Sequence, residues 1–408
     1  MVITMDHWRR TEAGLFLERG EALEQVGRLD EAMSEFKRAI RADPGLAEAH
    51  MALGYHYRRK NLLSKAAEEF RTAASLSPSY DSYFSLGHVL VDLGQPREAI
   101  EAFRRCLALA PGDPAVAYEI AYAYYCAGEY AAALEELQPL LAASPDDWEL
   151  HHLAGSCQLA LGHHALARQE FERALHLLPP GEDDADLQDA LQVALRYEEF
   201  ASIDPADIKA RLYADHGVVC LGSLGDDGLH ITPQPRDRLS YQDLARTLQR
   251  FHALRLRWRW RFDAVVGVDH RSMPLAVALA QSLRKQVVGP DYAPRYGRTL
   301  VVAATVDLPE LLGVVCEHIP GSYVTFAAAI DEASLERVVP DVIGLVSTMR
   351  VSLPWDPGER RSSVALAARE INATLKSLPV DENLVQQVHY YASKHRRLRF
   401  FMSRDTAD

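Results

Sequence analysis

Six polar residues, in two short stretches of the second half of the chain, have side chains that could bind a ligand. They are Asp269, His270, Arg271 and Ser272 in the first stretch, and Thr305 and Asp307 in the second. Each stretch follows a run of apolar and β-branched residues. A histidine beside an arginine and a serine could bind an anion or act as a general base. The simpler interpretation, which we favour, is a pair of polar loops without a ligand.

Basic and apolar residues alternate between Arg255 and Arg261, in the run RLRWRWR. Arginines interleaved with tryptophans could contact single-stranded nucleic acid through charge and stacking. Strict alternation is also typical of the lead-in to a half-buried edge strand, with its arginines facing solvent. Of these two interpretations we favour the edge strand.

The sequence offers little for metal or redox chemistry. Five cysteines lie far apart and form no CxxC pair, so we expect neither a disulfide nor a zinc framework; they are Cys106, Cys126, Cys157, Cys220 and Cys316. The stretch GSLGDDG at residues 222–228 contains turn signals and is not a phosphate-binding P-loop. We therefore expect no metal, no cofactor and no catalytic residue.

The formal net charge of -13 is unevenly distributed along the chain. Residues 1–200 carry 18 Lys and Arg against 33 Asp and Glu, a net charge of -15, whereas residues 201–408 carry 26 against 24, a net charge of +2. The acidic half repels nucleic acid and anionic membranes, and favours a basic partner if charge steers association. We expect no nucleic-acid partner, and we place a domain boundary at residue 200.

The start of the chain, MVITMDHWRR, lacks the apolar stretch of a signal peptide. No run in the sequence reaches the roughly 18 apolar residues that a membrane span needs. These features predict a cytoplasmic protein without a membrane partner.

The elements that must position the polar stretches alternate between short β-branched runs and helical segments, which predicts an α/β domain with a mostly parallel sheet over residues 201–408. The predicted strands are Gly217–Leu221, Phe262–Val268, Gln286–Val288, Thr299–Ala304, Tyr323–Ala328 and Val342–Ser347. The predicted helices are Tyr241–Leu254, Pro274–Lys285, Leu308–His318, Ser362–Leu378 and Glu382–Arg397. Ligands of such sheets bind at the carboxyl ends of the strands, where both polar stretches fall.

Residues 263–288 and 297–321 resemble the core of the type I phosphoribosyltransferase fold, and the resemblance spans roughly residues 205–350. In that family two adjacent acids hold the ribose hydroxyls, and small residues let backbone amides bind the phosphate. Here Ala303 and Ala304 stand at the acidic pair, and Leu308, Pro309 and Glu310 at the small residues. The resemblance thus implies a degenerate domain that lacks the main anchor for a phosphoribosyl donor.

The first half contains an internal repeat. Prolines recur at spacings of 34, 33, 34 and 34 residues, and alanine, aromatic or leucine, and small residues recur at fixed distances before them. The columns are Pro44, Pro78, Pro111, Pro145, Pro179; Ala32, Ala66, Ala99, Ala133, Ala167; Phe36, Phe70, Phe103, Leu137, Phe171; and Gly20, Gly54, Gly87, Ala121, Gly155. We expect the small column where the two helices of a repeat cross closely, and the aromatic column between neighbouring repeats.

This pattern resembles the tetratricopeptide repeat from residue 13 to about residue 180. The segment Asp184–Phe200 resembles the polar helix that caps such an array. The predicted fold class is therefore an α-helical solenoid of five tetratricopeptide repeats with a capping helix over residues 1–200, followed by the α/β domain.

The resemblance implies a concave groove lined by the first helix of each repeat. Transferring the family's groove positions gives Tyr55, Arg58, Arg59, Phe84, His88, Tyr118, Tyr122, Tyr125, His152 and Ser156. Chaperone-binding members grip a terminal carboxylate with Lys and Asn, but the matching positions here are Leu17 and Glu21. Tyrosines give large contact area with few rotors, so the groove could hold an extended or helical peptide. Some of these tyrosines could instead only pack against the adjacent helix.

Together these features predict a non-catalytic adaptor that binds a protein or peptide in its groove. The alternative is a phosphoribosyltransferase-like enzyme, or a sensor of a nucleotide or another phosphorylated small molecule, that the repeats recruit to a partner. The two differ in whether the loops around Asp269 and Asp307 bind a phosphorylated ligand.

Overall fold

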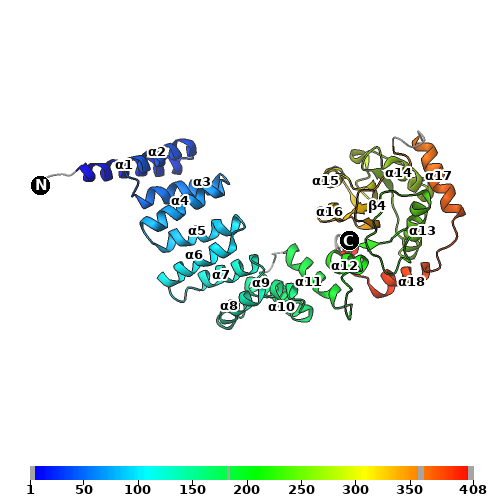
Figure 1. Ribbon diagram of the computed structural model, residues 1–408, viewed down its shortest axis with the longest axis horizontal. Helices are drawn as coiled ribbons and strands as arrows, with labels where there is room; N and C mark the ends of the chain where they lie inside the picture. The colour runs from blue at the N-terminus through cyan, green and yellow to red at the C-terminus, as the bar shows by residue number, and fades with distance from the viewer. Residues whose placement is uncertain (1–4, 180, 182–183, 357–362, 403–408) are drawn as a thin grey trace. The chain divides into compact units, whose positions relative to one another are not determined.

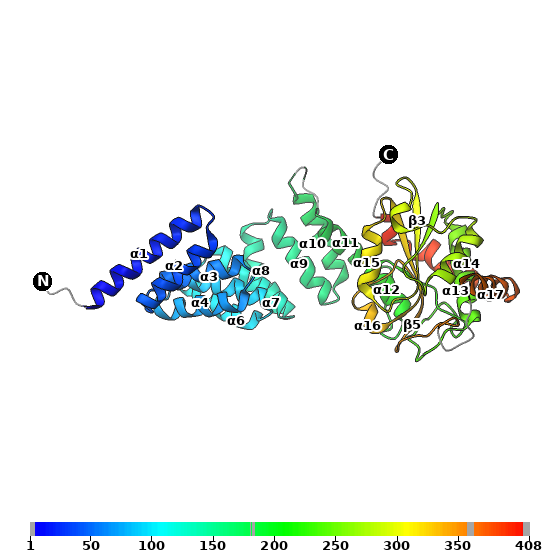
Figure 2. The same cartoon turned by 90° about the horizontal axis from the view of Figure 1, so that it is seen from above.

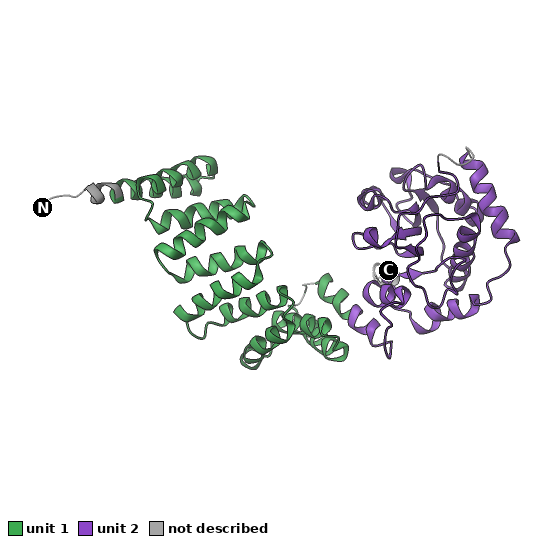
Figure 3. Ribbon diagram, in the orientation of Figure 1, with its two compact units in different colours: residues 1–191 green, residues 192–408 purple. Residues whose placement is uncertain are grey.

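The computed structural model describes residues 5–179, 181, 184–356 and 363–402, with side chains from residue 10 to residue 400 (Figure 1). The chain forms two compact units, residues 1–191 and 192–408 (Figure 3). The predicted boundary at residue 200 lies beyond this division, which falls inside helix α11 (Ala185–Tyr197). The last turn of α11 belongs to the second unit because Arg196 donates to the carbonyl groups of Ala214 and Asp215, at 3.0 and 3.1 Å.

The first unit consists of helices that pack in consecutive pairs. Ten of them precede α11: α1 (Met5–Gln25), α2 (Leu29–Ala42), α3 (Ala47–Arg59), α4 (Leu63–Leu76), α5 (Tyr80–Asp92), α6 (Pro96–Leu109), α7 (Pro114–Cys126), α8 (Tyr130–Ala143), α9 (Trp148–Ala160) and α10 (His164–Leu177). Between the helices of each pair the backbone takes a left-handed conformation, as at Gly27 and Asn61 (φ 77° and 56°). A residue in this conformation commonly ends a helix.

A contact between a glycine and a phenylalanine ring holds four of these pairs together. A Cβ atom built on Gly20, Gly54, Gly87 or Gly155 would lie 2.5 to 2.7 Å from the ring of Phe36, Phe70, Phe103 or Phe171. Real side chains essentially never approach so closely, so only glycine fits. The aromatic column therefore lies against the glycine of its own helix pair, a contact that was not predicted from the sequence.

The fourth pair replaces both partners of this contact. Ala121 stands at the glycine position and Leu137 at the phenylalanine position, and both side chains are fully buried. A methyl group has been added on one helix and an aromatic ring has been reduced to a branched aliphatic chain on the other. The two changes offset each other in volume, which is what close packing between the helices requires.

Two histidines fasten the start of a pair to its second helix. The Nδ1 and Nε2 atoms of His50 lie 2.6 Å from Glu69 Oε2 and 3.2 Å from the Pro44 carbonyl oxygen. His151 makes the same contacts three pairs later, at 2.6 Å to Glu170 and 3.0 Å to the Pro145 carbonyl. Both ring nitrogens face acceptors, an arrangement that suits the doubly protonated ring. The hydrogen bond to Glu69 raises the pKa of His50 against the opposing effect of burial.

The second unit is built on five parallel strands in the order β1-β5-β4-β3-β2. The strands are β1 (Val219–Cys220), β2 (Ala264–Gly267), β3 (Arg298–Thr305), β4 (Ser322–Asp331) and β5 (Val342–Ser347). The predicted strand Gln286–Val288 contributes a single bridge, from Val287 to Val265 on the outer side of β2. After β2 the chain therefore passes to the outer side of that strand, and from β3 onward each new strand is added on the opposite side of β2.

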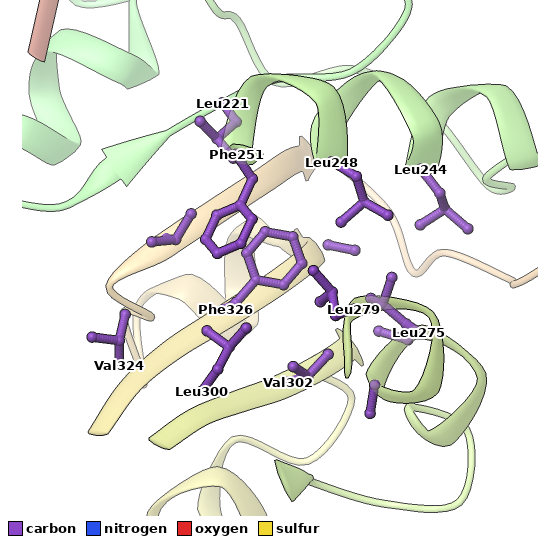
Figure 4. Packing of buried hydrophobic residues seen from close by; sticks show 14 of the residues in the cluster. Leu221, Leu244, Leu248, Phe251, Leu275, Leu279, Leu300, Val302, Val324 and Phe326 are labelled. Atoms are coloured by element: carbon purple, nitrogen blue, oxygen red, sulfur yellow. The ribbon is translucent and has the colours of Figure 1, made fainter. Parts of the chain in front are cut away.

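Helices cover both faces of the sheet (Figure 2). One face carries α13 (Tyr241–Arg257), α14 (Met273–Leu283) and α17 (Val364–Ser377); the other carries α12 (Ile208–His216), α15 (Pro309–Glu317) and α16 (Glu332–Leu335). In the larger core, Leu248 and Phe251 of α13 pack on Phe326 and neighbouring strand residues (Figure 4). No helix in the described part of the chain is long and apolar enough to cross a membrane.

The C-terminal helices are shorter than the sequence predicts. Helix α17 lies within the predicted segment, whose first residue, Ser362, is outside the described residues. The predicted helix Glu382–Arg397 is instead α18 (Leu384–His389) followed by a π-helical turn at Tyr390–Lys394. The other short elements are a 3₁₀ turn at Pro290–Tyr292 and α19 (Arg399–Met402).

The run from Arg255 to Arg261 is not an edge strand, so this prediction was wrong. Helix α13 extends to Arg257, because its buried face continues through Phe251 and Leu254 at helical spacing. Arg259 then takes a left-handed conformation (φ 55°), and Trp260 is buried in the core at 4% exposure. The alternation of basic and apolar residues reflects a helix end followed by a turn.

We expect Gly87→Ala to lower the free energy of unfolding of the first unit by about 1–3 kcal/mol, because the added methyl group overpacks against the Phe103 ring. Denaturation of the full chain, combined with hydrogen exchange in α5 and α6, measures this. Gly14→Ala in α1 is the matched control: no atom lies within 4 Å of its Cβ position, so alanine should be neutral or stabilise by up to about 1 kcal/mol.

The fourth pair, in which alanine and leucine replace the glycine and the phenylalanine, suggests a second substitution that should offset the first. Phe103→Leu, added to Gly87→Ala, should cost clearly less than the sum of the two single substitutions. Strict additivity of the two free-energy changes would show that the ring and the missing Cβ do not interact.

Candidate functional site

The first helix of each pair contributes to one continuous surface of the first unit. Helix α1 contacts α3, the Tyr55 hydroxyl of α3 lies 2.8 Å from the Ser85 hydroxyl of α5, α5 contacts α7, and α7 contacts α9. Each of these helices is the first member of its pair, so their exposed faces adjoin. The groove residues expected from the sequence lie on α3, α5, α7 and α9.

One end of this surface has a hollow of about 520 Å³ lined by Glu24, Tyr55, Arg58 and Arg59. Tyr55 is 41% exposed, and its hydroxyl lies 2.8 Å from the Ser85 hydroxyl. Arg59 forms an ion pair with Glu24. Arg58 is exposed and forms no ion pair or hydrogen bond with any described residue. The hollow therefore contains an aromatic ring beside an arginine that has no direct ion-pair partner among the described residues.

The middle of the surface is more closely packed. Phe84 is half-buried, with its ring centroid 5.3 Å from that of Tyr80 and 4.5 Å from that of His88. His88 Nδ1 lies 3.7 Å from Glu119 Oε2. Burial, and secondarily the charge of Arg58, lower the pKa of His88. Burial raises the pKa of Glu119, and the charge of Arg58 opposes this. The Phe84 ring therefore packs mainly against the core, beside Tyr80 and His88. The positive charge of Arg58 affects the pKa of a group on α5 and of another on α7.

Tyrosines dominate the α7 section. Tyr122 is 38% exposed, and its ring stacks on that of Tyr125 with centroids 6.3 Å apart. Tyr118 and Tyr125 are half-buried and pack against the core cluster around Leu137. Burial raises the pKa of Tyr118 to about 12. Of the three, Tyr122 presents the most ring surface to solvent.

The last section, on α9, offers less to a ligand. His152 is half-buried between Trp148 and Phe171, with ring centroids 6.4 and 6.1 Å away. The Ser156 hydroxyl donates to the His152 carbonyl oxygen at 3.0 Å. Both side chains are thus engaged within the helix pair.

At the carboxyl edge of the sheet, two of the six predicted residues support the backbone. Asp269 accepts a hydrogen bond from the Ser272 amide at 2.7 Å, at the start of α14. Ser272 is 1% exposed, and its hydroxyl accepts from the Ala304 amide at 3.0 Å. His270 is exposed. Asp269 and Ser272 therefore join the loop after β2 to strand β3.

Arg271 is the centre of an ion-pair network at the same edge. It binds Asp356 in a bidentate manner, at 2.9 and 2.6 Å, and it also pairs with Asp307. Thr305 Oγ1 lies 3.4 Å from the same guanidinium group. Burial alone would raise the pKa of Asp356, but hydrogen bonds from Arg271 and the Leu353 amide outweigh it and lower the pKa. The structure thus brings Arg271, Thr305 and Asp307 together.

This network lies where the direction of the chain along the sheet reverses, between β2 and β3. Ligands of open α/β sheets bind at that point. Here the arginine is already paired with two carboxylates, so it offers little positive charge to a phosphate. Across the described residues no group of three His, Cys, Asp or Glu side chains could hold a metal ion.

Several residues of both regions are not among those predicted from the sequence. Asp356 and Arg350 follow strand β5, and Arg350 lies 3.3 Å from Asp307. The rule that polar residues gather at strand ends would have drawn attention to the segment after β5. Glu24, Ser85 and Glu119 were missed in the groove because they lie at helix positions that the family pattern does not mark.

A buried cation, Arg250, holds the loop at residues 222–228. Arg250 is 1% exposed and lies 2.7 Å from Asp226 and 2.5 Å from Asp381. It also donates to the Leu221 carbonyl oxygen at 2.8 Å. The loop is therefore a turn held in place by Arg250, as expected from its turn signals. Its Asp226 carboxylate is already paired with that arginine.

Comparison with known proteins bears on the first unit alone. Residues 17–81 and 90–152 match two family models described as tetratricopeptide repeat. The chain therefore carries tetratricopeptide repeats in its first unit. It is similar to cellulose synthase 2 operon protein C of Komagataeibacter xylinus, at 30% identity over 101 residues, which are 25% of this chain and 8% of that protein.

Three solved structures are similar to 41–45% of this chain. The MamA protein is 23% identical, with a TM-score of 0.38, over 41% of this chain and 91% of that one. YrrB, described as a TPR protein with an unusual peptide-binding site, is 22% identical, with a TM-score of 0.39, over 45% and 91%. A thermophilic TPR protein of Thermus thermophilus, TTC0263, is 24% identical, with a TM-score of 0.32, over 45% and 98%.

We expect Arg271→Ala to lower the free energy of unfolding of the second unit by about 1–3 kcal/mol, because it leaves two half-buried carboxylates close together. The effect should depend on pH. The folded-state pKa of Asp356 is lowered, so its stabilisation is present above the unfolded value of about 3.9 and is lost as pH falls through the folded pKa.

Urea denaturation of both proteins between neutral and acidic pH measures this difference. Arg337→Ala is the control, because it breaks a pair with Glu310 whose side chains are 61% and 60% exposed, and should cost little. If the difference in free energy of unfolding between wild type and Arg271→Ala does not narrow below the unfolded pKa of Asp356, the role of Arg271 in lowering that pKa is contradicted.

Proposed function

We propose that this chain is a non-catalytic adaptor that holds an extended peptide segment of another protein on the surface formed by α3, α5, α7 and α9. The observation that carries the proposal is Tyr122, a large aromatic side chain that is 38% exposed and stacked on Tyr125. An exposed, rigid aromatic ring next to a second ring is a typical anchor for a partner. Tetratricopeptide repeats generally mediate protein–protein interactions, which agrees with this role.

In this proposal the ten helices before α11 are five repeats, and α11 is the capping helix. Its first half supports this role, because Leu187 is fully buried and Asp184 caps its amide at 3.0 Å. Acidic side chains at its start suit the helix dipole. Such a helix shields the apolar end of the stack, which would otherwise face solvent.

The second unit, in this proposal, is a degenerate phosphoribosyltransferase-like domain without transfer activity. Its parallel sheet and the reversal of direction between β2 and β3 support the likeness. Ala303 and Ala304 are 2% and 0% exposed, so two core methyl groups occupy the positions of the expected acids. The pairing of Arg271 with Asp307 and Asp356 argues against the alternative, a sensor of phosphorylated ligands.

We expect Tyr122→Ala to weaken partner binding by about 2 kcal/mol or more, roughly 30-fold, as for an anchor residue. The partner would be purified with the full-length chain from native cells, and its affinity measured by calorimetry. Tyr296→Ala, which removes a tyrosine that is 95% exposed in the second unit, is the control and should bind normally.

Circular dichroism of Tyr122→Ala should stay at the wild-type level, because Ile120 and Ala123 fill the core beside it. Unchanged affinity would place the binding surface elsewhere. A reduced helical signal would mean that Tyr122 is needed for packing.

Calorimetric titration of the full chain with phosphoribosyl pyrophosphate and magnesium should give no binding heat at millimolar ligand. The physical reason is that Asp307 and Asp356, at the carboxyl edge of the sheet, are both paired with Arg271 and neutralise its charge. Micromolar binding that disappears in Asp307→Ala would overturn the adaptor proposal and favour an enzyme or sensor.

A further inference from the structure

Arg58 is the feature of the groove that most restricts what can bind there. It lies on α3 beside Tyr55, in the hollow of about 520 Å³ described above. Unlike Arg59, which pairs with Glu24, it has no ion-pair or hydrogen-bond partner among the described residues. An exposed guanidinium next to an exposed ring is a site for a planar anion, because it presents parallel N–H donors to a carboxylate.

No acidic side chain among the described residues forms a direct ion pair with Arg58. The pKa of His88 is lowered, so this ring is mainly neutral at pH 7. Glu119, on α7, lies close to His88 at 3.7 Å, and burial raises its pKa. Arg58 reaches both groups only through its field. Among the residues that line the hollow, Arg58 and Arg59 outnumber Glu24, so the lining carries a net positive charge within a half-chain whose net charge is -15.

We infer that the hollow at Tyr55 and Arg58 binds the side-chain carboxylate of an Asp or Glu residue within the bound peptide. This inference rests on the proposed function and names the chemistry of the partner. A side-chain carboxylate is preferred to a carboxy terminus because the positions that grip a terminus in related grooves carry Leu17 and Glu21. Leu17 is partly buried against the core and offers no donor.

The tyrosine section sets a second requirement. Helices α3 and α7 are two groove helices apart, which corresponds to roughly 20 Å at a spacing of about 10 Å. An extended peptide covers this distance in roughly six residues. The peptide therefore carries an acidic residue and, about six residues away, an apolar or aromatic residue that stacks on Tyr122. Its other residues are neutral or basic, because the solenoid is acidic.

A peptide library displayed on phage tests this without a known partner. Random peptides of about 12 residues are long enough to span both contacts. Selection on the full-length protein should enrich Asp or Glu at one position and an aromatic or apolar residue about six positions away. Selection on Arg58→Glu should replace the acidic residue by Lys or Arg.

Arg105→Glu is the matched control. Arg105 lies on α6, is exposed, and has no ion pair or hydrogen bond with a described residue, so its substitution changes the net charge equally. This control should select the same peptides as wild type. A synthetic selected peptide, amidated at its carboxy terminus, should bind about tenfold more weakly when its acidic residue becomes Gln or when the protein carries Arg58→Gln.

The outcomes separate this inference from the proposed function. Selected peptides that need Tyr122 but show no acidic preference, or that bind only with a free carboxy terminus, overturn the inference and leave groove binding in place. Peptides with an acidic residue that bind equally to Arg58→Glu also overturn it. Selection of no peptide, or of peptides indifferent to Tyr122→Ala, overturns both.

Discussion

The close approach of a glycine to a phenylalanine ring sets the geometry on which the first unit depends. With no Cβ on one helix, the ring of the other can lie directly on the backbone, as Phe70 lies on Gly54. The helices of a pair are thereby held at one distance and one crossing angle. Because each pair stacks on the next, this distance also sets where the exposed faces of α3, α5 and α7 meet. The relative placement of Arg58 and Tyr122 is therefore a consequence of how these helix pairs pack.

Much of this arrangement could be predicted from the sequence, because the repeat supplies five independent copies of each position. Periodicity places Tyr122 and Arg58 on the correct helix face, but it cannot tell how deeply a side chain is covered. Phe84 belongs mainly to the core because Tyr80 and His88 enclose its ring. Arg58 and Arg59 are adjacent and alike in sequence, and only the position of Glu24, on another helix, distinguishes the paired arginine from the unpaired one.

The second unit offered weaker signals for the opposite reason, since it has no internal copies. Its buried strands could be predicted from continuous apolar runs, whereas the run from Arg255 to Arg261 was wrongly predicted as a strand. The alternation of basic and apolar residues in this run resembles a strand, although the helical spacing of the preceding buried residues continues into it. The partner of Arg271 could not be predicted locally either, because Asp356 is 85 residues away along the chain. Long-range ion pairs leave no trace in spacing.

The histidine contacts at the start of two helix pairs couple folding to proton binding. His50 holds a proton between Glu69 and the Pro44 carbonyl more firmly than an unfolded chain would. Through His50, folding near neutral pH takes up a fraction of a proton, whereas histidines whose pKa is lowered by burial, such as His252, release protons to the buffer. The heat measured on unfolding then includes the ionisation enthalpy of the buffer. We therefore expect the calorimetric enthalpy of unfolding to differ between a phosphate buffer and an amine buffer.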